Sequence, residues 1–448
     1  MVLPSISVWV ILSDFSMKLL IYQALARLWG KCGFSSWDEP TLEYIKSLGI
    51  DYLWLTGIPR HASGEPFVKG DPGCPYSISD WKDVNPYMAD CQSRRMEEFD
   101  SLVKRVHDAG LKLLIDYIPN HVARNYHGQI VHYDYCDADW TDTLKNDWSS
   151  PATRAEMLEV LRFWMGRGVD GFRCDMVELV PPEALGDLIS AVKRDYPEAL
   201  FVAEVYGREN YRKYIEEVGF DLLYDKSGLY DNLRKICAGC LTARSITWNW
   251  QFLGNMQPRM LNFLENHDEQ RVASSFFLGA PSRAYAALAV SLLFNDASFM
   301  LYFGQEAGEN AAESDNGRTS IFDITHPATL GRLYQAVHGT GSLLPEESAV
   351  LARYREMLGY AVMPVFRSGK SWDLCYCNLD SPGFDADRHF AFLRYDDSAA
   401  WLVFCNFSSS PLRSLRISIP SELEAVCGCA CVSVSEVGGF DAAVIRVK

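Results

Sequence analysis

One stretch decides the fold of this chain: GFRCD at residues 171–175, a helical pattern over residues 182–194, and LFVAE at residues 200–204. Each apolar run is short enough to be a buried strand, and each ends on a carboxylate. The segment between them has the apolar spacing of an amphipathic helix. A strand, a helix and a second strand in succession predict a unit of parallel β-structure.

The same unit recurs on both sides of this stretch. The expected strands are Leu20–Tyr22, Tyr52–Leu55, Leu113–Asp116, Gly171–Asp175, Leu200–Glu204, Phe220–Tyr224, Leu261–Leu264 and Phe299–Phe303. The helical patterns that follow them cover residues 39–48, 96–109, 153–165, 182–194, 211–218, 229–237, 283–294 and 330–337. Eight such pairs in a row predict an α/β fold, a (β/α)8 TIM barrel, rather than an open sheet.

The pattern of apolar and turn-forming residues changes after about residue 350. Apolar runs at residues 390–393, 401–404, 415–419 and 443–447 alternate with turns rich in Ser, Pro, Gly and Asp. This pattern predicts a C-terminal antiparallel β-sandwich domain. We therefore expect a barrel over residues 17–345, a short insertion after strand 3 at residues 121–150, and the C-terminal domain over residues 350–448.

The composition and charge of the chain disfavour some classes of function. Hydrophobic residues make up 48% of the 448 residues, which is enough for a large core, and the formal net charge is −16. With no basic run in the chain, we expect no nucleic-acid partner and no membrane partner. The apolar first 16 residues lack the features of a signal peptide, so we expect a cytoplasmic protein, with a periplasmic location as the alternative. A non-native leader with a working start at Met17 is another interpretation of this segment.

The 13 cysteines include two closely spaced groups. Cys237 and Cys240 form one, and Cys427, Cys429 and Cys431 form the other. A zinc site would need a second pair or histidines at matching spacing, and no histidine lies near either group in the sequence. We therefore expect buried thiols in a reducing compartment rather than a metal or redox centre.

Polar side chains gather at the C-terminal ends of four expected strands. The segments are DYIPNH at residues 116–121, GFRCD at 171–175, VAE at 202–204 and ENHD at 265–268. A single carboxylate after a strand is often a helix cap. Catalytic residues of a (β/α)8 barrel come from this end of several strands, so four such segments in chain order indicate an active site.

The carboxylates on adjacent strands suit cleavage of a glycosidic bond with retention. One ionised carboxylate attacks the anomeric carbon and a protonated one, about 5–5.5 Å away, donates to the leaving oxygen. Arg173 lies two residues before Asp175, on the same strand face, and we expect its charge to lower the pKa of Asp175. Glu204 would hold the proton beside a like charge, and Asp268 would stabilise the transition state.

The four segments resemble, in order and spacing, the signature regions of the α-amylase family of glycoside hydrolases. PYSISDWKDVNP at residues 75–86 and FMLYFGQE at residues 299–306 resemble two further family segments. The stretch NHDEQR at residues 266–271 is similar to that of compact α-amylases from Bacteroides-type bacteria. The resemblance implies that Asp175 is the nucleophile, Glu204 the acid/base and Asp268 the stabiliser of the transition state. It also implies four subsite residues that bind substrate: Arg173, His121, His267 and Tyr76. Asp116 matches the first signature region, where its role is largely architectural.

Three departures from the family pattern concern metal and acceptor sites. Many family members hold calcium between a long insertion and the barrel, but the insertion here is short. Asn120 matches one ligand, and Asp134, Asp137 and Asp139 are candidates for others, although a solvated acidic loop is the favoured interpretation. The metal loop of some members is absent from residues 30–38, so we expect no required calcium. Glu178 and Leu179 stand where the family often has Lys-His.

The resemblance implies an α-amylase-type hydrolase that acts on α-1,4-glucosidic bonds of an α-glucan such as starch or glycogen, or of maltooligosaccharides. Two alternatives stay open. A glucanotransferase of the same family would share the covalent intermediate. A non-catalytic carbohydrate-binding barrel would lack a catalytic carboxylate, whereas all three are present. A nucleotide-dependent enzyme is disfavoured because no Gly-rich phosphate loop follows any expected strand.

Overall fold

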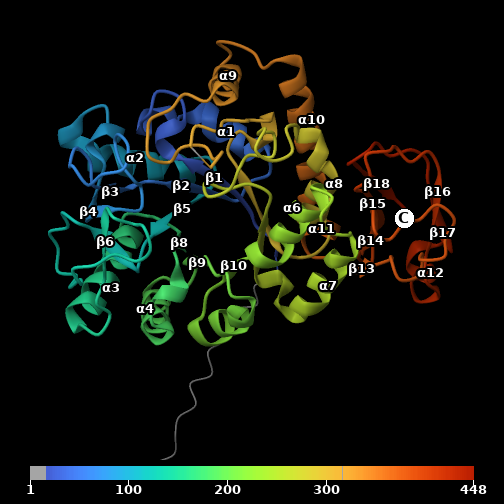
Figure 1. Ribbon diagram of the computed structural model, residues 1–448, viewed down its shortest axis with the longest axis horizontal. Helices are drawn as coiled ribbons and strands as arrows, with labels where there is room; N and C mark the ends of the chain where they lie inside the picture. The colour runs from blue at the N-terminus through green and yellow to red at the C-terminus, as the bar shows by residue number, and fades with distance from the viewer. Residues whose placement is uncertain (1–16, 315) are drawn as a thin grey trace, which may run out of the picture.

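Eight parallel strands close a barrel in the computed structural model, which describes residues 17–314 and 316–448 (Figure 1). The leader expected at residues 1–16 lies outside the described residues. Around the barrel the strands run β1-β12-β11-β10-β9-β8-β5-β2. Their bounds are β1 Leu20–Leu25, β2 Tyr52–Thr56, β5 Lys112–Tyr117, β8 Gly171–Cys174, β9 Leu200–Ala203, β10 Leu222–Tyr224, β11 Met260–Phe263 and β12 Ser298–Tyr302. The predicted (β/α)8 barrel is confirmed, strand for strand.

The strands read as unbroken apolar runs because both of their faces are covered. Side chains such as Ile21, Leu114 and Met300 fill the interior of the barrel, and their neighbours along each strand pack outward against helices. In the parallel register, Arg173 of β8 lies opposite Asp116 of β5 on one side and Val202 of β9 on the other. Charged groups therefore meet where these three strands end.

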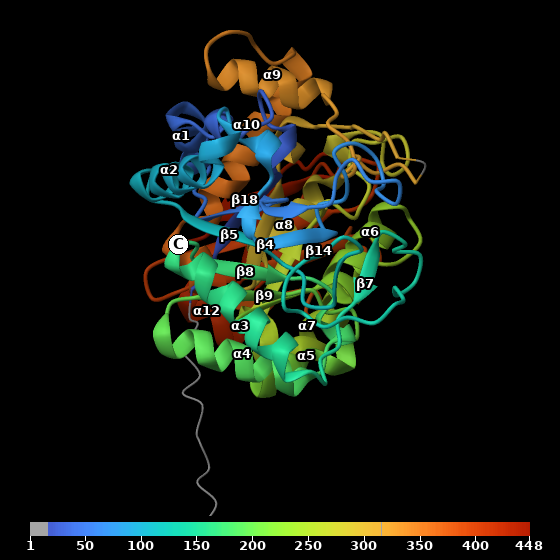
Figure 2. The ribbon, with the colours of Figure 1, turned by 90° about the vertical axis from the view of Figure 1, so that its left-hand side faces the viewer.

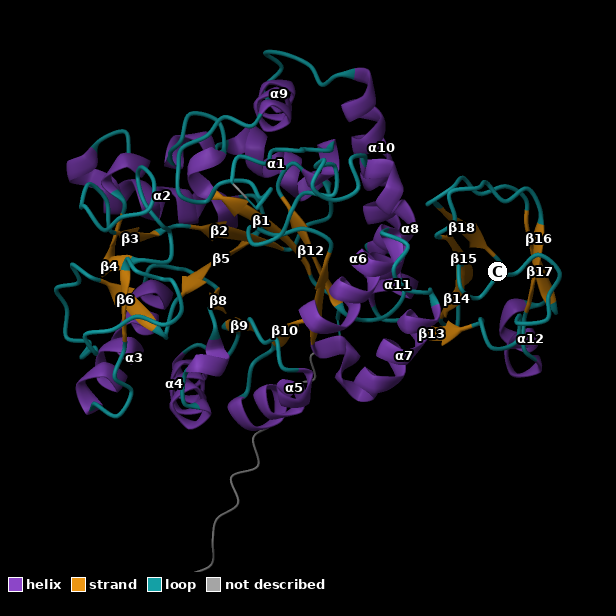
Figure 3. Cartoon of the chain, in the orientation of Figure 1, coloured by secondary structure: helices purple, strands orange, loops and turns teal. Residues whose placement is uncertain are grey.

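Helices surround the barrel (Figure 3). All eight expected helical segments are present, although the one at residues 211–218 is a single α-turn, α5, followed by a π-helical turn. Helices α7 and α10 were not expected from the sequence. The bounds are α1 Glu39–Ser47, α2 Arg95–Asp108, α3 Pro151–Gly166, α4 Pro182–Asp195, α5 Tyr211–Lys213, α6 Asp231–Cys237, α7 Arg244–Leu253, α8 Tyr285–Leu293, α9 Ala328–Val337 and α10 Pro345–Ala361.

Two antiparallel pairs extend from the barrel where strands β2 and β5 end. Strands β3 (Pro59–His61) and β4 (Ile78–Val84) follow β2, and β6 (His121–Ala123) and β7 (Thr143–Lys145) follow β5. Figure 2 shows β5, β8 and β9 side by side, with α3 and α4 outside them. The second pair is the short insertion expected after strand 3.

The C-terminal region forms antiparallel sheets beside the barrel (Figure 1). Phe390 and Phe392 on one face of the larger sheet pack against Phe294, with ring centroids 4.9 and 5.0 Å apart. The other face covers the smaller sheet and helix α12. The bounds are α11 Pro364–Arg367, β13 Lys370–Asp373, β14 His389–Tyr395, β15 Ala400–Asn406, β18 Ala442–Arg446, β16 Leu415–Ser418, β17 Cys431–Val434 and α12 Ser421–Cys427.

The boundary expected at residue 350 falls inside helix α10. Leu351, Tyr354 and Leu358 of that helix belong to the apolar cluster of the barrel, and the first C-terminal strand begins at Lys370. The buried guanidinium of Arg394 joins the two parts. It donates to the carbonyls of Val365, Phe366 and Gly369, and pairs with Asp296.

Candidate active site

Strand pairing places the two central carboxylates. The backbone N–H of Asp175 donates to Tyr117 O at 2.9 Å, and that of Glu204 donates to Cys174 O at 3.1 Å. Each residue thus continues the barrel hydrogen bonding by one position beyond the last residue of β8 or β9. Both side chains are nearly buried at the C-terminal end of the barrel, where this fold carries its chemistry.

One guanidinium lies between the two carboxylates. Arg173 is fully buried; its Nη1 donates to Asp175 Oδ1 at 2.8 Å, and its Nη2 lies 2.8 Å from Glu204 Oε2. Asp116 Oδ1 lies 3.5 Å from the same Nη1. A fully buried cation is stable only when it is paired, and here its partners are the carboxylates of three adjacent strands.

The pKa of Asp175 lies well above its ordinary value. Burial raises it most, Arg173 lowers it, and the Glu204 and Asp268 carboxylates raise it further. The expected effect of Arg173 is present, but burial and like charges outweigh it. The net direction of the shift is therefore set by burial and by the two neighbouring carboxylates.

Asp268 behaves in the opposite way. Burial alone would raise its pKa, but His267 lowers it below the ordinary value, with Arg173 and Arg318 adding to the effect. His267 Nε2 lies 3.0 Å from Asp268 Oδ2. Asp268 is thus the carboxylate best suited to remain an anion.

An aromatic platform borders the carboxylates. The ring of Tyr76 stacks on His267, with centroids 5.2 Å apart and planes 17° from parallel. Its hydroxyl lies within hydrogen-bond range of His267 Nε2 and of Asp116 Oδ1, and Trp54 Nε1 donates to Asp116 Oδ2 at 3.1 Å. Asp116 thereby contacts Arg173, Tyr76 and Trp54 beneath the site.

Met176, the residue after the candidate nucleophile, adopts an unusual backbone conformation. Its φ of 42° lies in the left-handed region, which costs a residue with a side chain on the order of 1 kcal/mol or more. In this conformation its N–H donates to Glu204 Oε2 at 3.0 Å. The strained turn therefore supplies a backbone hydrogen bond to the carboxylate of the next strand.

These groups open into one cavity of about 510 Å³. Six of the eight residues expected in the site line it, while Arg173 and Asp116 lie beneath its floor. The lining residues from the expected set are Tyr76, His121, Asp175, Glu204, His267 and Asp268. Burial lowers the pKa of His121 to about 4, so this ring is neutral near pH 7.

Sequence reasoning missed several lining residues. They come from loops whose course the strand pattern does not specify: Lys69, Trp140, Tyr206, Asn316 and Arg318. Of these only Tyr206 carried a local signal, because it follows Glu204 by two positions. Glu178 stands where the family often has a lysine. Its carboxylate accepts hydrogen bonds from the loop after β9 and does not line the cavity.

Asn120, which matches one calcium ligand of the family pattern, bonds to a carboxylate that is already paired with a lysine. Asn120 Nδ2 donates to Asp137 Oδ2 at 2.8 Å, but Lys145 Nζ lies 2.8 and 3.0 Å from the two oxygens of Asp137. Within residues 17–314 and 316–448, no group of three or more His, Cys, Asp or Glu side chains could hold a metal ion. The residues present therefore do not fit a calcium ion at this place. All 13 cysteines are free thiols.

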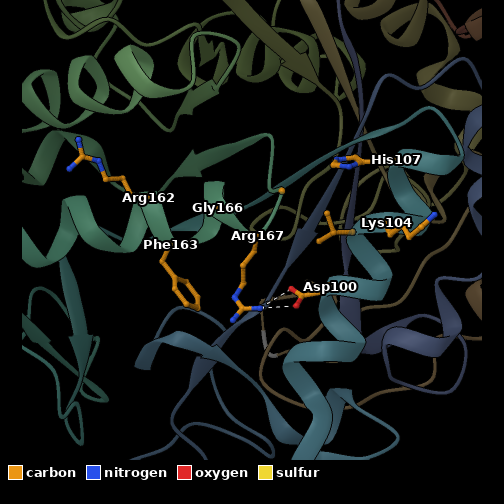
Figure 4. Close-up of a pocket in the computed structure, with 9 residues that line it drawn as sticks. Asp100, Lys104, His107, Arg162, Phe163, Gly166 and Arg167 are labelled. Carbon is orange, nitrogen blue, oxygen red and sulfur yellow. Dashed lines mark hydrogen bonds and ion pairs between the residues drawn. The ribbon is translucent and has the colours of Figure 1, made fainter.

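A second hollow, of about 680 Å³, lies outside the barrel between α2 and α3 (Figure 4). Its charged side chains are already paired. Arg167 binds Asp100 at 2.8 Å, Arg162 binds Asp195 and His107 binds Asp170. None of the eight candidate site residues borders it, so the hollow at the strand ends is the candidate active site.

Comparison with known proteins agrees with this site. The sequence model of the alpha-amylase catalytic domain matches residues 40–143 and 132–325. These residues make up more than half of the chain, and the chain therefore belongs to the alpha-amylase family.

Two curated relatives and one solved structure show the range of similarity. The chain is 26% identical over 428 residues to "Alpha-amylase MalA" of Haloarcula japonica, covering 88% of this chain and 56% of the relative. It is 22% identical over 410 residues to an "Alpha-1,4-glucan:maltose-1-phosphate maltosyltransferase" of Picrophilus torridus, covering 85% and 59%. The maltogenic alpha-amylase AmyB of Thermotoga neapolitana has the same fold, with a TM-score of 0.71, 22% identity and 96% of both chains covered. The chain thus spans less than two thirds of the length of these curated relatives.

Within the part of the chain that the structure describes, no helix combines the length and the apolar character needed to cross a membrane.

Proposed function

We propose that this protein is a retaining glycoside hydrolase that cleaves α-1,4-glucosidic bonds in starch, glycogen or maltooligosaccharides. One observation carries the proposal: the fully buried guanidinium of Arg173 lies 2.8 Å from both Asp175 and Glu204, beneath a cavity that these two carboxylates line together with Asp268. Two carboxylates on one cation are close neighbours, as the double-displacement reaction needs.

In the first step, the Asp175 carboxylate attacks the anomeric carbon while Glu204 gives its proton to the departing glycosidic oxygen. The C–O bond to the leaving sugar breaks as the bond to Asp175 Oδ forms. In the second step, Glu204 takes a proton from water, whose oxygen attacks the same carbon and releases Asp175. Asp268, held as an anion beside His267, would stabilise the positive charge of both transition states.

Asp175→Asn and Glu204→Gln test the assignment. Each keeps the size of its side chain, so the protein should fold, while hydrolysis of soluble starch should fall at least about 10³-fold. The matched controls are Asp195→Asn and Glu183→Gln, both on the outer helix α4. Near-full activity of either site variant would refute the assigned roles.

Transfer to a second sugar is the second candidate, favoured by the maltosyltransferase relative. It uses the same covalent intermediate and differs in the acceptor. Chromatography of products from maltotriose separates the two: products longer than maltotriose indicate transfer, whereas maltose and glucose alone indicate hydrolysis.

A further inference from the structure

The loop after Glu204, residues 205–210, is held by one carboxylate. Glu178 Oε2 accepts from the N–H of Tyr206 at 2.7 Å, and Glu178 Oε1 accepts from Asn210 Nδ2 at 2.6 Å. The N–H of Gly207 lies 3.2 Å from both oxygens. Glu178 itself belongs to the turn after β8, so this clamp ties that turn to the loop after β9.

The clamp leaves no room for another side chain. A Cβ atom at Gly207 would lie 2.7 Å from Glu178 Oε1 and 2.7 Å from Asn210 Nδ2. Contacts this short would displace the carboxylate from its donors. A side chain at residue 207 would therefore push the ends of the Glu178 and Asn210 side chains apart from their present positions and disturb the clamp.

The clamped loop presents a phenol to the acid/base candidate. Tyr206 OH donates to Glu204 Oε1 at 2.8 Å. Glu204 is 3% exposed, whereas Tyr206 is 37% exposed and lines the cavity. The phenol thus lies at the rim, between the buried carboxyl and the opening.

The two oxygens of Glu204 have different surroundings. Oε2 accepts from the N–H of Met176 at 3.0 Å and lies 2.8 Å from Arg173 Nη2. A proton on Oε2 would face these donors, so the acidic proton belongs on Oε1. The hydroxyl of Tyr206 is both donor and acceptor, and it can bond Oε1 in either protonation state.

We propose that Glu178 and Tyr206 are positioning residues for proton transfer: Tyr206 fixes the proton-bearing Oε1 of Glu204, and Glu178 fixes the loop that carries Tyr206. This inference rests on the proposed function. It assigns a positioning role to the carboxylate of Glu178, which with Leu179 stands where the family often has Lys-His.

Charged and titratable groups on four sides face Glu204. They are Arg173 and Asp175 from β8 and its turn, Tyr224 from β10, Asp268 after β11, and Tyr206. Partial burial, and then the Glu204 charge, raise the pKa of Tyr206 well above its ordinary value. Tyr206→Phe therefore removes a neutral hydroxyl and leaves the charges unchanged.

Two substrates isolate the proton transfer. Cleavage of maltopentaose needs a proton on the leaving oxygen, whereas α-maltosyl fluoride releases fluoride with little acid assistance. Tyr206→Phe should lower kcat/KM for maltopentaose about tenfold and leave that for the fluoride within about twofold. The control is Tyr376→Phe, an exposed tyrosine of the C-terminal region, which should match the wild type on both substrates. An equal loss on both substrates, or no loss on either, would overturn the inference.

Glu178→Ala and Gly207→Ala should give the same selective loss, because each opens the clamp. Glu183→Ala, an exposed carboxylate at the start of α4, is the control for the first. Thermal unfolding checks that each variant folds, and Asn210→Ala replaces a variant that does not. A wild-type protein that cleaves neither substrate would refute the proposed function. A wild type that cleaves both, with clamp variants equal to it, would refute this inference alone.

Discussion

The ammonium of Lys145 lies 2.8 Å from Oδ2 and 3.0 Å from Oδ1 of Asp137. Lys145 is the last residue of β7, and Asp137 lies in the loop before that strand. Asn120, which follows barrel strand β5, donates to the same carboxylate. A side-chain cation therefore joins the insertion to the barrel beside Asn120, the residue for which the sequence resemblance implied a calcium ligand. Lys145 and Asn120 both lower the pKa of Asp137, although partial burial opposes them.

We expect the fold to be insensitive to metal removal. Excess EDTA should leave the melting temperature unchanged, because Lys145 supplies the positive charge internally. Lys145→Met should lower stability by about 1 kcal/mol, the modest size being due to the partial exposure of the pair. Differential scanning fluorimetry measures both, with the exposed Lys104→Met as the control. A fall in melting temperature with EDTA, reversed by calcium, would contradict the expectation.

Arg173→Lys should abolish most activity although the charge is kept. A lysine has one nitrogen, so it cannot contact Asp175 and Glu204 with two separate groups as the guanidinium does. We expect kcat/KM on maltopentaose to fall at least about 100-fold. Arg162→Lys, at a half-exposed pair on α3, should have no effect on the same rate. Wild-type kinetics in Arg173→Lys would show that the bridging geometry is dispensable.

His121 predicts a pH dependence of stability. Its pKa is about 4 in the folded protein because burial disfavours the charged ring, against an ordinary value of about 6.5. The unfolded chain therefore binds more protons between these values, and stability should fall as pH falls from about 6.5 to about 4. Urea unfolding at pH 7 and pH 5 should show the loss, and His121→Gln should reduce its size. His132 is exposed, and His132→Gln is the control: it should leave the pH dependence of stability unchanged.

Gly171 should tolerate no side chain. A Cβ there would lie 2.1 Å from Leu200 O and 2.8 Å from Leu200 N, both backbone atoms of the adjacent barrel strand. Gly171→Ala should cost about 3 kcal/mol, since neither strand can move. Gly331→Ala, in helix α9 with nothing within 4 Å of the added atom, should instead stabilise by about 0.5–1 kcal/mol. Denaturant unfolding of the two variants should give shifts of opposite sign.

The barrel could be predicted from the sequence because its strands are buried on both faces. Runs such as residues 200–203 are apolar throughout, are followed by a polar residue and alternate with helices, so each strand can be recognised from its local sequence. Helix α10 was not predicted, although its buried residues recur at helical spacing and pack against the barrel: Val350, Leu351, Tyr354, Met357, Leu358 and Ala361. The pairs β3–β4 and β6–β7 were not predicted either, since all four of their strands include polar residues and three of the four have only three residues.

Part of the candidate site could likewise be predicted from the sequence, and part could not. Asp175, Glu204 and Asp268 were predicted because the ends of parallel barrel strands converge whatever the loops do. The net rise in the pKa of Asp175 was not, because it depends on burial and on two carboxylates brought close by folding. Tyr206 and Glu178 were also missed. Their bonds depend on the course of the loop after β9, which no period in the sequence encodes.

Arg394 has a consequence for how the molecule unfolds. Its guanidinium is fully buried and donates to three carbonyls just before β13, while Phe390 of its own strand packs on Phe294 of the barrel. The C-terminal sheet and the barrel thus share one apolar cluster, and neither can separate without exposing it. The two parts should therefore melt in a single cooperative transition, and cleavage between residues 367 and 370 should release no independently stable barrel.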